Sequence, residues 1–256
     1  MKQTKIDWCD CTLNPVKGCS NGCEYCYARK LNDRFHFVKD WNKPEFFPEV
    51  LEQLKSKKPK SIFMDSMSDC GCWTVPQIRQ VARAMKDNSQ HNYIFLTKTP
   101  KLFVEKCKTI VEDANNGNVF VGVSVTRKSE ISRLNYLPLY ANKFVSIEPI
   151  LEDFGDIYNT DLCNPCFYAN TIIIGAETGN RKDKVIPKKE WIMNIVNAVD
   201  KKNKENENFI KYHKNGHLLK IRIFMKESLR EIMGKDFRQD KLLWDTNKEG
   251  NNEITK

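Results

Sequence analysis

Short apolar, β-branched runs recur along the chain and alternate with segments of helical period. Most of these runs lack the strict alternation of a strand with one solvated face, so they predict strands buried on both faces of a parallel sheet. The runs are SIFMD (61–65), YIFLT (93–97), VFVGVSV (119–125), FVSIE (144–148), TIIIGA (171–176) and IRIFM (221–225).

Proline residues mark the expected starts of three helices between these runs. Pro76 begins PQIRQVARAM, Thr99 and Pro100 suit an N-cap and a first helical residue, and Pro187 opens PKKEWIMNIVNAVDK. In the second of these helices Cys107 falls on the apolar face, so its thiol is expected in the core.

The alternation of strand and helix runs from about residue 10 to about residue 230. This order predicts an α/β fold with a parallel sheet or barrel. No repeat and no linker divides the chain, so residues 1–245 are expected to form a single domain. The tail, 246–256, has almost nothing to bury and is expected to be disordered.

Each apolar run ends in polar or charged residues. In a β/α barrel the carboxyl ends of the strands meet at one face, where active sites are built. Any one ending is ordinary for a strand that enters a loop, but the set predicts one polar cavity. Its members are Asp65, Ser66, Thr97, Lys98, Ser124, Thr126, Glu148, Glu177, Thr178, Lys226 and Glu227.

Composition narrows the cellular setting. The 256 residues are 40% hydrophobic, with no apolar run of membrane-spanning length and no apolar signal region at the N-terminus. The expected location is therefore cytoplasmic, where the ten cysteines stay reduced and clustered thiols indicate metal or catalysis. The net charge of +9 permits contact with nucleic acid, but Lys/Asn-rich stretches such as 200–216 explain much of it equally well.

Three cysteines are concentrated in GCSNGCEYCYAR (18–29), where Cys19, Cys23 and Cys26 follow the spacing C-x3-C-x2-C. Continuous helix would place these thiols on one stripe as core filler, but the Asn-Gly pair and flanking glycine favour a loop. A zinc ion would need a fourth ligand from elsewhere. A [4Fe–4S] cluster held by three thiolates would keep one iron open to another molecule.

The motif C-x3-C-x-aromatic-C, with Tyr25 before the third cysteine, resembles the signature of the radical S-adenosylmethionine (radical SAM) superfamily. The chain also resembles a phage-associated three-Cys-motif family of radical SAM relatives, largely of unknown function, over roughly residues 5 to 230. The words that carry this resemblance, in order, are KIDWCDCTLNPVKGC, CEYCYA, SMSD, TKTP, GVSV, SIEPI, IIIGAETG and IFMKES.

The resemblance implies a partial (β/α) TIM-like barrel of parallel strands, of the radical SAM type. It also implies a metal-binding, iron–sulfur enzyme that cleaves S-adenosyl-L-methionine (SAM) reductively at a [4Fe–4S] cluster. The cleavage gives methionine and a 5′-deoxyadenosyl radical that takes hydrogen from an unknown substrate.

The same resemblance suggests roles for individual residues. Cys19, Cys23 and Cys26 hold three irons, while the amino and carboxylate groups of SAM bind the fourth. The candidate SAM contacts are Tyr25 (adenine), Ser66 and Ser68 (amino group), Ser124 (ribose) and Arg133 (carboxylate). The candidates for contact with SAM or substrate are Glu148 and Glu177, and for an anionic substrate group Lys98 and Lys226.

Further cysteines depart from the family pattern. Cys9 and Cys11 stand where a threonine or small residue is expected. Loops at the same barrel face carry Cys70 and Cys72, and Cys163 and Cys166, which together offer four ligands for a second iron–sulfur cluster or a zinc ion. The alternative is four scattered free thiols. His213 and His217 lie in a polar loop, where solvated imidazoles are expected.

The sequence therefore predicts a radical SAM enzyme that receives electrons from flavodoxin or ferredoxin. A nucleic acid or nucleotide substrate, for modification or repair, suits the basic charge and the phage association. The alternatives are a zinc-dependent nucleic-acid-binding protein without redox chemistry, and a barrel that keeps its cluster but has lost turnover. No membrane association is expected.

Overall fold

The computed structural model describes residues 2–113, 117–137, 142–163, 170–212 and 220–245. Within these ranges the side chains of 2–3, 107–113, 161 and 208–212 are not described, so the prediction for Cys107 lies outside the described part. His213, His217 and Cys166 also lie outside it.

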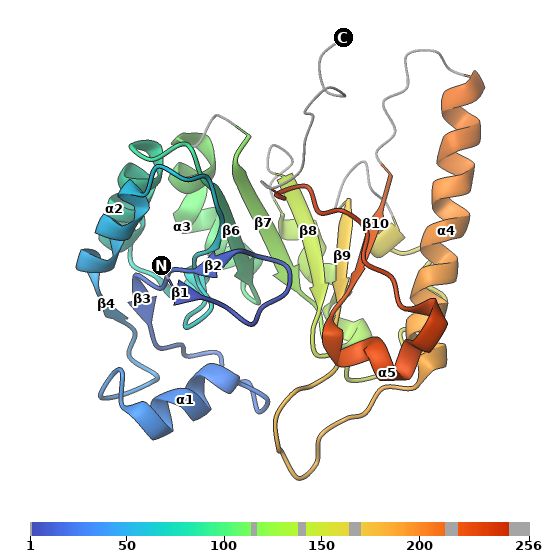
Figure 1. Ribbon diagram of the computed structural model, residues 1–256, viewed down its shortest axis with the longest axis horizontal. Coiled ribbons are helices and arrows are strands. Elements are labelled where there is room, and N and C mark those ends of the chain that lie inside the picture. Colours follow the sequence, from blue (N-terminus) through green and yellow to red (C-terminus); the bar gives the residue numbers. More distant parts are fainter. Residues whose placement is uncertain (1, 114–116, 138–141, 164–169, 213–219, 246–256) are drawn as a thin grey trace.

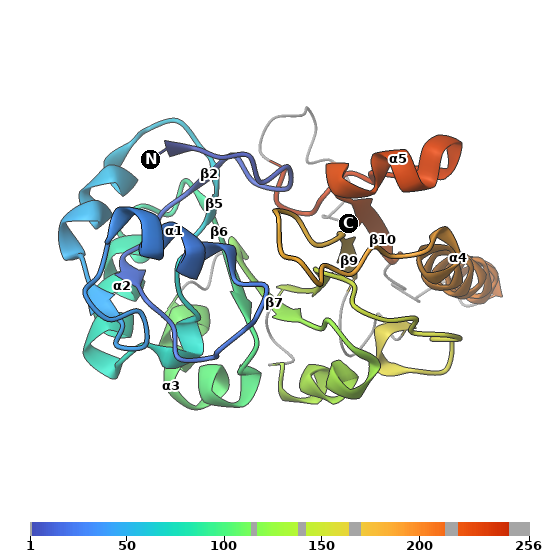
Figure 2. The same cartoon turned by 90° about the horizontal axis from the view of Figure 1, so that it is seen from below.

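The main sheet has eight strands in the order β1-β2-β5-β6-β7-β8-β9-β10, and all but β1 run parallel. Figure 2 shows these strands following one another around an open arc, with α2, α3 and α4 outside it. The predicted parallel α/β architecture is therefore confirmed as a seven-strand half-barrel with one added antiparallel strand. The strand bounds are β1 Lys2–Gln3, β2 Cys11–Thr12, β5 Ser61–Phe63, β6 Asn92–Thr97, β7 Val119–Ser124, β8 Asn142–Ile147, β9 Thr171–Ile174 and β10 Arg222–Met225.

Six of these strands, from β5 to β10, overlap the six apolar runs that the sequence singles out; β6 begins one residue and β8 two residues before its run. A small antiparallel pair, β3 (Val16–Lys17) and β4 (Glu45–Phe46), stands apart from the main sheet. The helices are α1 Tyr27–Phe35, α2 Val75–Lys86, α3 Pro100–Asp113, α4 Lys189–Tyr212 and α5 Arg230–Met233. Short 3₁₀ segments are η1 Pro48–Lys55, η2 Cys70–Cys72, η3 Lys128–Tyr136, η4 Asp161–Cys163, η5 Glu227–Leu229 and η6 Gly234–Asp236.

The helix starts agree with the sequence to within two residues. α3 begins at Pro100 as predicted, and α2 begins one residue before Pro76, where Thr74 N donates to Gln77 Oε1 at 2.8 Å. α4 begins at Lys189 and not at Pro187. The Trp191 amide donates to Lys188 O at 3.1 Å, and no backbone hydrogen bond of the helix reaches Pro187 among the described residues. Pro187 therefore precedes the helix. A proline is favoured near a helix start at several positions, because its missing N–H costs nothing there.

The two faces of the sheet carry different cores. Aliphatic side chains on the outer face pack under α2, α3 and α4. Alternate residues on the inner face form a mainly aromatic layer of Phe63, Ile94, Phe120, Phe144, Ile173 and Phe224. Gly122 makes room for this layer, because a Cβ there would lie 2.3 Å from the Phe144 ring.

Two tryptophans from the ends of the chain close the amino-terminal end of the half-barrel. Trp244 Nε1 donates to Trp8 O at 2.6 Å, and the Trp244 ring lies 4.9 Å from that of Phe144. The Trp244 carbonyl accepts bonds from Asn92 Nδ2 at 3.0 Å and from Ser61 Oγ, both at the starts of strands. The opposite, carboxyl end of the strands therefore stays available for a site, next to α1 (Figure 1).

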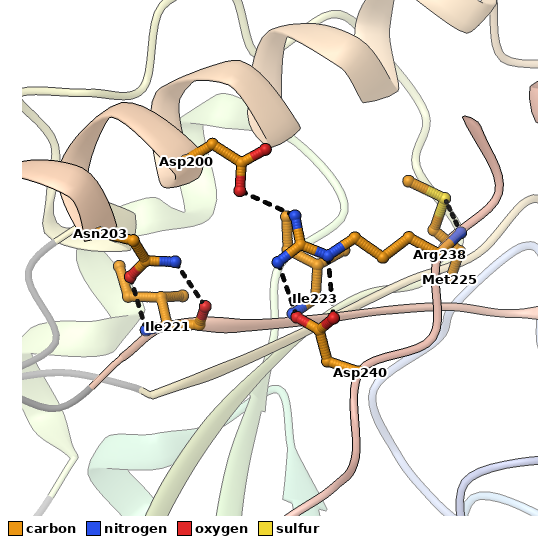
Figure 3. A network of polar contacts seen from close by, with 7 residues as sticks. All are labelled: Asp200, Asn203, Ile221, Ile223, Met225, Arg238 and Asp240. Carbon is orange, nitrogen blue, oxygen red and sulfur yellow. Dashed lines mark hydrogen bonds and ion pairs between the residues drawn. The ribbon is translucent and has the colours of Figure 1, made fainter.

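The free edge of β10 is covered by the segment that follows η6. Asp240 N donates to Ile223 O at 2.8 Å and Met225 N donates to Arg238 O at 2.8 Å, an antiparallel contact that occupies the edge groups of the strand. Figure 3 shows Arg238 between Asp200 on α4 and Asp240, at 2.7 and 2.8 Å. Such covering removes an exposed edge that otherwise pairs with other chains.

Candidate cofactor site at the three-cysteine loop

The three-cysteine segment connects β3 to α1 and is not helical before Tyr27, so the predicted loop is confirmed. Gly18 begins it with φ of +103°, and a Cβ there would lie 2.9 Å from Trp41 O. Cys19 N donates to the same carbonyl at 2.7 Å, and Cys26 Sγ accepts the Arg29 amide at 3.4 Å as the N-cap of α1. The loop is thus held at both ends by backbone bonds.

Asp69 holds the middle of this loop to the sheet. Its carboxylate accepts Asn21 Nδ2 at 2.7 Å, Lys98 N at 2.8 Å and Thr97 Oγ1 at 2.6 Å. Asp69 is 4% exposed, so its carboxylate oxygens need these hydrogen-bond donors. The bonds fix the loop over the carboxyl end of β6.

Cys19, Cys23 and Cys26 are reduced and half-buried. Within the described ranges, no three His, Cys, Asp or Glu side chains are gathered closely enough to hold a metal ion. The donor set nevertheless suits an iron–sulfur cluster, because three thiols on one loop supply the ligands that such clusters use. Metal sites commonly complete their geometry only on binding.

A cavity of about 350 Å³ opens beside this loop. Cys23 and Tyr25 line it from the loop, Lys98 from the end of β6, and Arg127 and Arg133 from the segment after β7. Pockets for small molecules begin at about 300 Å³. A cavity therefore exists at the carboxyl ends of β6 and β7. Of the strand-end residues expected to share one polar cavity, Lys98 and Thr126 line it, and a single cavity for the whole set stays a prediction. The candidate residues Cys23, Tyr25 and Arg133 line it as well.

Lys98 and Tyr25 face each other across this cavity. The ammonium of Lys98 lies 5.6 Å from the centre of the Tyr25 ring. Burial acts to lower the pKa of Lys98, but the nearby Tyr25 and Cys23 outweigh it, so its pKa is raised. Burial raises the pKa of Tyr25 as well. Lys98 is therefore a retained positive charge in the wall of the cavity.

Arg133 is held by two acceptors. Its Nη1 donates to Ser124 O at 2.9 Å, and its Nη2 lies 2.9 Å from Glu130 Oε1. The hydroxyl of Ser124 is buried and has no partner among the described residues. Ser146 pairs with Ser124 in the β7–β8 register, and its hydroxyl is also buried without a hydrogen-bond partner among the described residues. Alternation along the two strands puts both hydroxyls on the inner face, above Phe120 and Phe144.

The two serines expected near the SAM amino group are used in local bonds and do not line the cavity. Ser66 Oγ donates to Asn14 Oδ1 at 3.0 Å, and Ser68 Oγ accepts Trp73 Nε1 at 2.9 Å. Their role as cofactor contacts stays a prediction.

Three other candidate residues occur as ion pairs. Lys226 Nζ pairs with Glu148 across β9, where Gly175 leaves the room: a Cβ there would lie 3.0 Å from Lys226 Cδ and 3.1 Å from Glu148 Cγ. Glu177 accepts Arg181 Nε at 2.7 Å, and this bond lowers the pKa of Glu177. Arg181, which the sequence patterns do not single out, also lies 3.8 Å from Glu24 of the loop.

The extra cysteines lie in different places. Cys72, at the end of η2, contacts the three-cysteine loop, where its Sγ lies 3.5 Å from Ser20 Oγ and 3.8 Å from Asn21 Oδ1. Interaction with the Cys19 thiol lowers the pKa of Cys72 to about 6 and raises that of Cys19. Cys70 is fully buried, and Cys163 is buried in η4, which packs against η3 and α4. Since Cys166 lies outside the described residues, a shared site for these four thiols stays a prediction.

Fold and site together define a class: an α/β half-barrel protein with a loop of reduced cysteines beside a polar, charged cavity at the carboxyl ends of its strands. The chain belongs to the DUF5131 family, described as "Protein of unknown function (DUF5131)", whose family model matches residues 3–239. No curated protein and no solved structure matches the chain.

Asp69 and Arg181 are the main site residues that sequence patterns miss. Asp69 belongs to the word SMSD, but only its position after β5, close to the end of β6, gives it five donors from three segments.

None of the described helices is long and apolar enough to cross a membrane.

Proposed function

We propose that this protein is a radical SAM enzyme in which Cys19, Cys23 and Cys26 bind a [4Fe–4S] cluster. The single observation that carries the proposal is the position of the loop, whose Cys23 and Tyr25 share a cavity of about 350 Å³ with Lys98 and Arg133. A thiol loop and a cavity of small-molecule size meet at the carboxyl ends of parallel strands, the end at which barrel enzymes carry their sites.

The residues of the cavity suit the parts of SAM. The Tyr25 ring offers an aromatic face for a base, and burial raises the pKa of its hydroxyl. Lys98 supplies positive charge toward a carboxylate, and Arg127 and Arg133 add guanidinium groups that are paired with Glu24 and Glu130 in the same lining. When bound, the cluster supplies the electron for reductive cleavage of the sulfonium, and the protein's own part is to orient the nucleotide and limit water.

The inner face of the half-barrel suits a polar substrate. The Glu148–Lys226 pair and the hydroxyls of Ser124 and Ser146 lie above the layer that contains Phe120 and Phe144. Buried polar groups of this kind need hydrogen-bonding partners. Together with the net charge of +9, they favour a nucleotide or nucleic acid as substrate and a small flavodoxin or ferredoxin as electron donor.

The proposal is tested by metal content after anaerobic purification and reconstitution. Wild type should be brown and hold about four irons and four sulfides per chain. Cys23→Ala should lose the cluster, while Cys9→Ala, a half-buried thiol away from the loop, should keep it. Incubation with SAM and dithionite should then release 5′-deoxyadenosine from wild type only.

Each of the other possible results of these measurements identifies a specific alternative. Colourless protein with about one zinc per chain identifies the zinc-dependent nucleic-acid-binding protein instead. A cluster that yields no 5′-deoxyadenosine identifies a barrel without turnover. Full iron content in Cys23→Ala overturns the ligand assignment.

A further inference from the structure

Cys72 comes from a distant part of the chain and lies against the first thiol of the three-cysteine loop. Its Sγ lies 3.5 Å from Ser20 Oγ and 3.8 Å from Asn21 Oδ1, the two residues that follow Cys19, and its thiol interacts with that of Cys19. The contact therefore involves three consecutive residues of the loop.

The backbone on both sides of this contact is fixed by the same buried carboxylate. Asp69 accepts Asn21 Nδ2 at 2.7 Å from the loop and Gly71 N at 3.0 Å from η2. Gly71 itself has no room for a side chain, because a Cβ would lie 2.2 Å from Thr99 Oγ1. The two thiols are thus held together by the fold.

Cys70, two residues before Cys72, is a natural comparison. It is fully buried, and its amide lies 3.3 Å from the carboxylate of Asp65. Cys72 is half-buried, so a small oxidant reaches the Cys19–Cys72 pair more easily than it reaches Cys70.

We propose that Cys19 and Cys72 are a redox-active pair that forms a disulfide when Cys19 carries no iron. A low-molecular-weight disulfide such as glutathione disulfide takes up the two electrons. One S–S bond forms between Cys19 and Cys72, one breaks in the oxidant, and the two thiol protons end on the two glutathione thiols released.

The disulfide withholds a cluster ligand, so oxidised protein takes up iron only after reduction. This consequence rests on the proposed function, in which Cys19 is an iron ligand. The disulfide itself does not, because it requires only the contact between the two thiols.

The experiment uses full-length, cluster-free protein prepared anaerobically with a chelator. The protein is equilibrated with glutathione disulfide, blocked with a maleimide, digested with trypsin without reduction and analysed by mass spectrometry. The expected product is peptide 18–29 linked to peptide 61–79, which contain the two thiols. Cys72→Ser should abolish the linked pair, and Cys70→Ser, which alters the same peptide, should retain it.

A second measurement follows iron uptake by oxidised wild type before and after dithiothreitol. At least a several-fold gain in bound iron after reduction is expected, and it should shrink in Cys72→Ser. Absence of the linked peptides from oxidised wild type, or their persistence in Cys72→Ser, overturns the proposal. If the linked peptides form in protein that never assembles a cluster, the proposed radical SAM function is rejected. The proposed disulfide between Cys19 and Cys72 is then still supported.

Discussion

Asn21 Nδ2 donates to Asp69 Oδ2 at 2.7 Å, and this bond ties the three-cysteine loop to the carboxyl end of the half-barrel. Asp69 also bonds the turn that carries Cys72 and the start of the segment that carries Lys98. One buried carboxylate therefore fixes the relative positions of the thiols and of a cationic wall of the cavity.

Removing this bond should loosen the loop. Asn21→Ala leaves a buried carboxylate with one donor fewer, which costs about 1–2 kcal/mol of the free energy of unfolding. Asn42→Ala, at an exposed asparagine that accepts only a 3.3 Å bond from Arg29, serves as the control and should cost less than about 0.5 kcal/mol. Urea unfolding of the cluster-free protein under reductant measures both, and equal losses would contradict the role assigned to Asn21.

Lys98 should contribute to SAM binding through its charge. Lys98→Met keeps most of the side-chain volume and removes the ammonium, so the dissociation constant for SAM should rise about ten-fold, as expected for loss of a charged contact. Lys101→Met, on the exposed side of α3, should bind as wild type does. Equilibrium dialysis with anaerobically reconstituted protein gives the two constants. Unchanged binding in Lys98→Met would remove Lys98 from the site.

Asp65 should make stability depend on pH. Burial, with the nearby charge of Asp69, raises the pKa of Asp65 from 3.8 to about 8. Between these values the folded protein keeps a proton that the unfolded chain has lost, so stability falls as pH rises from about 4 to about 8. One such proton corresponds to about 1.4 kcal/mol per pH unit.

The matching measurement compares wild type with Asp65→Asn in urea at several pH values across this window. Asp65→Asn has no carboxyl to ionise, so its stability should decline less steeply than that of wild type. Other titrating groups are shared and cancel in the difference. Parallel pH curves would mean that Asp65 is ionised in the folded protein throughout.

Arg238 and Arg230 form a matched pair for the energetics of the C-terminal segment. Both arginines hold a carboxylate through two nitrogens, Arg238 with Asp240 and Arg230 with Glu227. The Arg238 side chain is 26% exposed and also bonds Asp200, whereas that of Arg230 is 57% exposed. Arg238→Ala should therefore cost about 1–3 kcal/mol and Arg230→Ala about 0–1 kcal/mol. Denaturant midpoints report both, and a smaller loss in Arg238→Ala would refute the ranking.

Much of the fold follows from local patterns. The runs around Ile62, Ile94, Val121, Val145, Ile173 and Ile223 predict strands because β-branched and aromatic residues pack well on a pleated, doubly covered sheet. Thr99 and Pro100 predict the start of α3, and Asn21-Gly22 predicts a loop between the thiols, because these residues restrict the backbone within a few positions. The family resemblance adds roles for residues such as Cys23 and Ser124, which stay predictions.

Contacts between segments that are distant in the sequence could not be predicted from it and are seen only in the tertiary structure. Nothing in the pattern around Cys72 distinguishes it from Cys70, yet one thiol contacts Cys19 and the other is fully buried. Asp69 likewise gains its five donors only because β5 and β6 end side by side under the loop.

By itself, then, the sequence determined the six strands from β5 to β10, the starts of α2, α3 and α4 to within two residues and the presence of a thiol loop, since these depend on short-range backbone preference and on the periodicity of burial. The tertiary structure decided which side chains meet: Asn21 with Asp69, Glu148 with Lys226, and Trp8 with Trp244. Such pairings join residues far apart in the chain, and they form only when the twist and order of the strands bring their ends to one place.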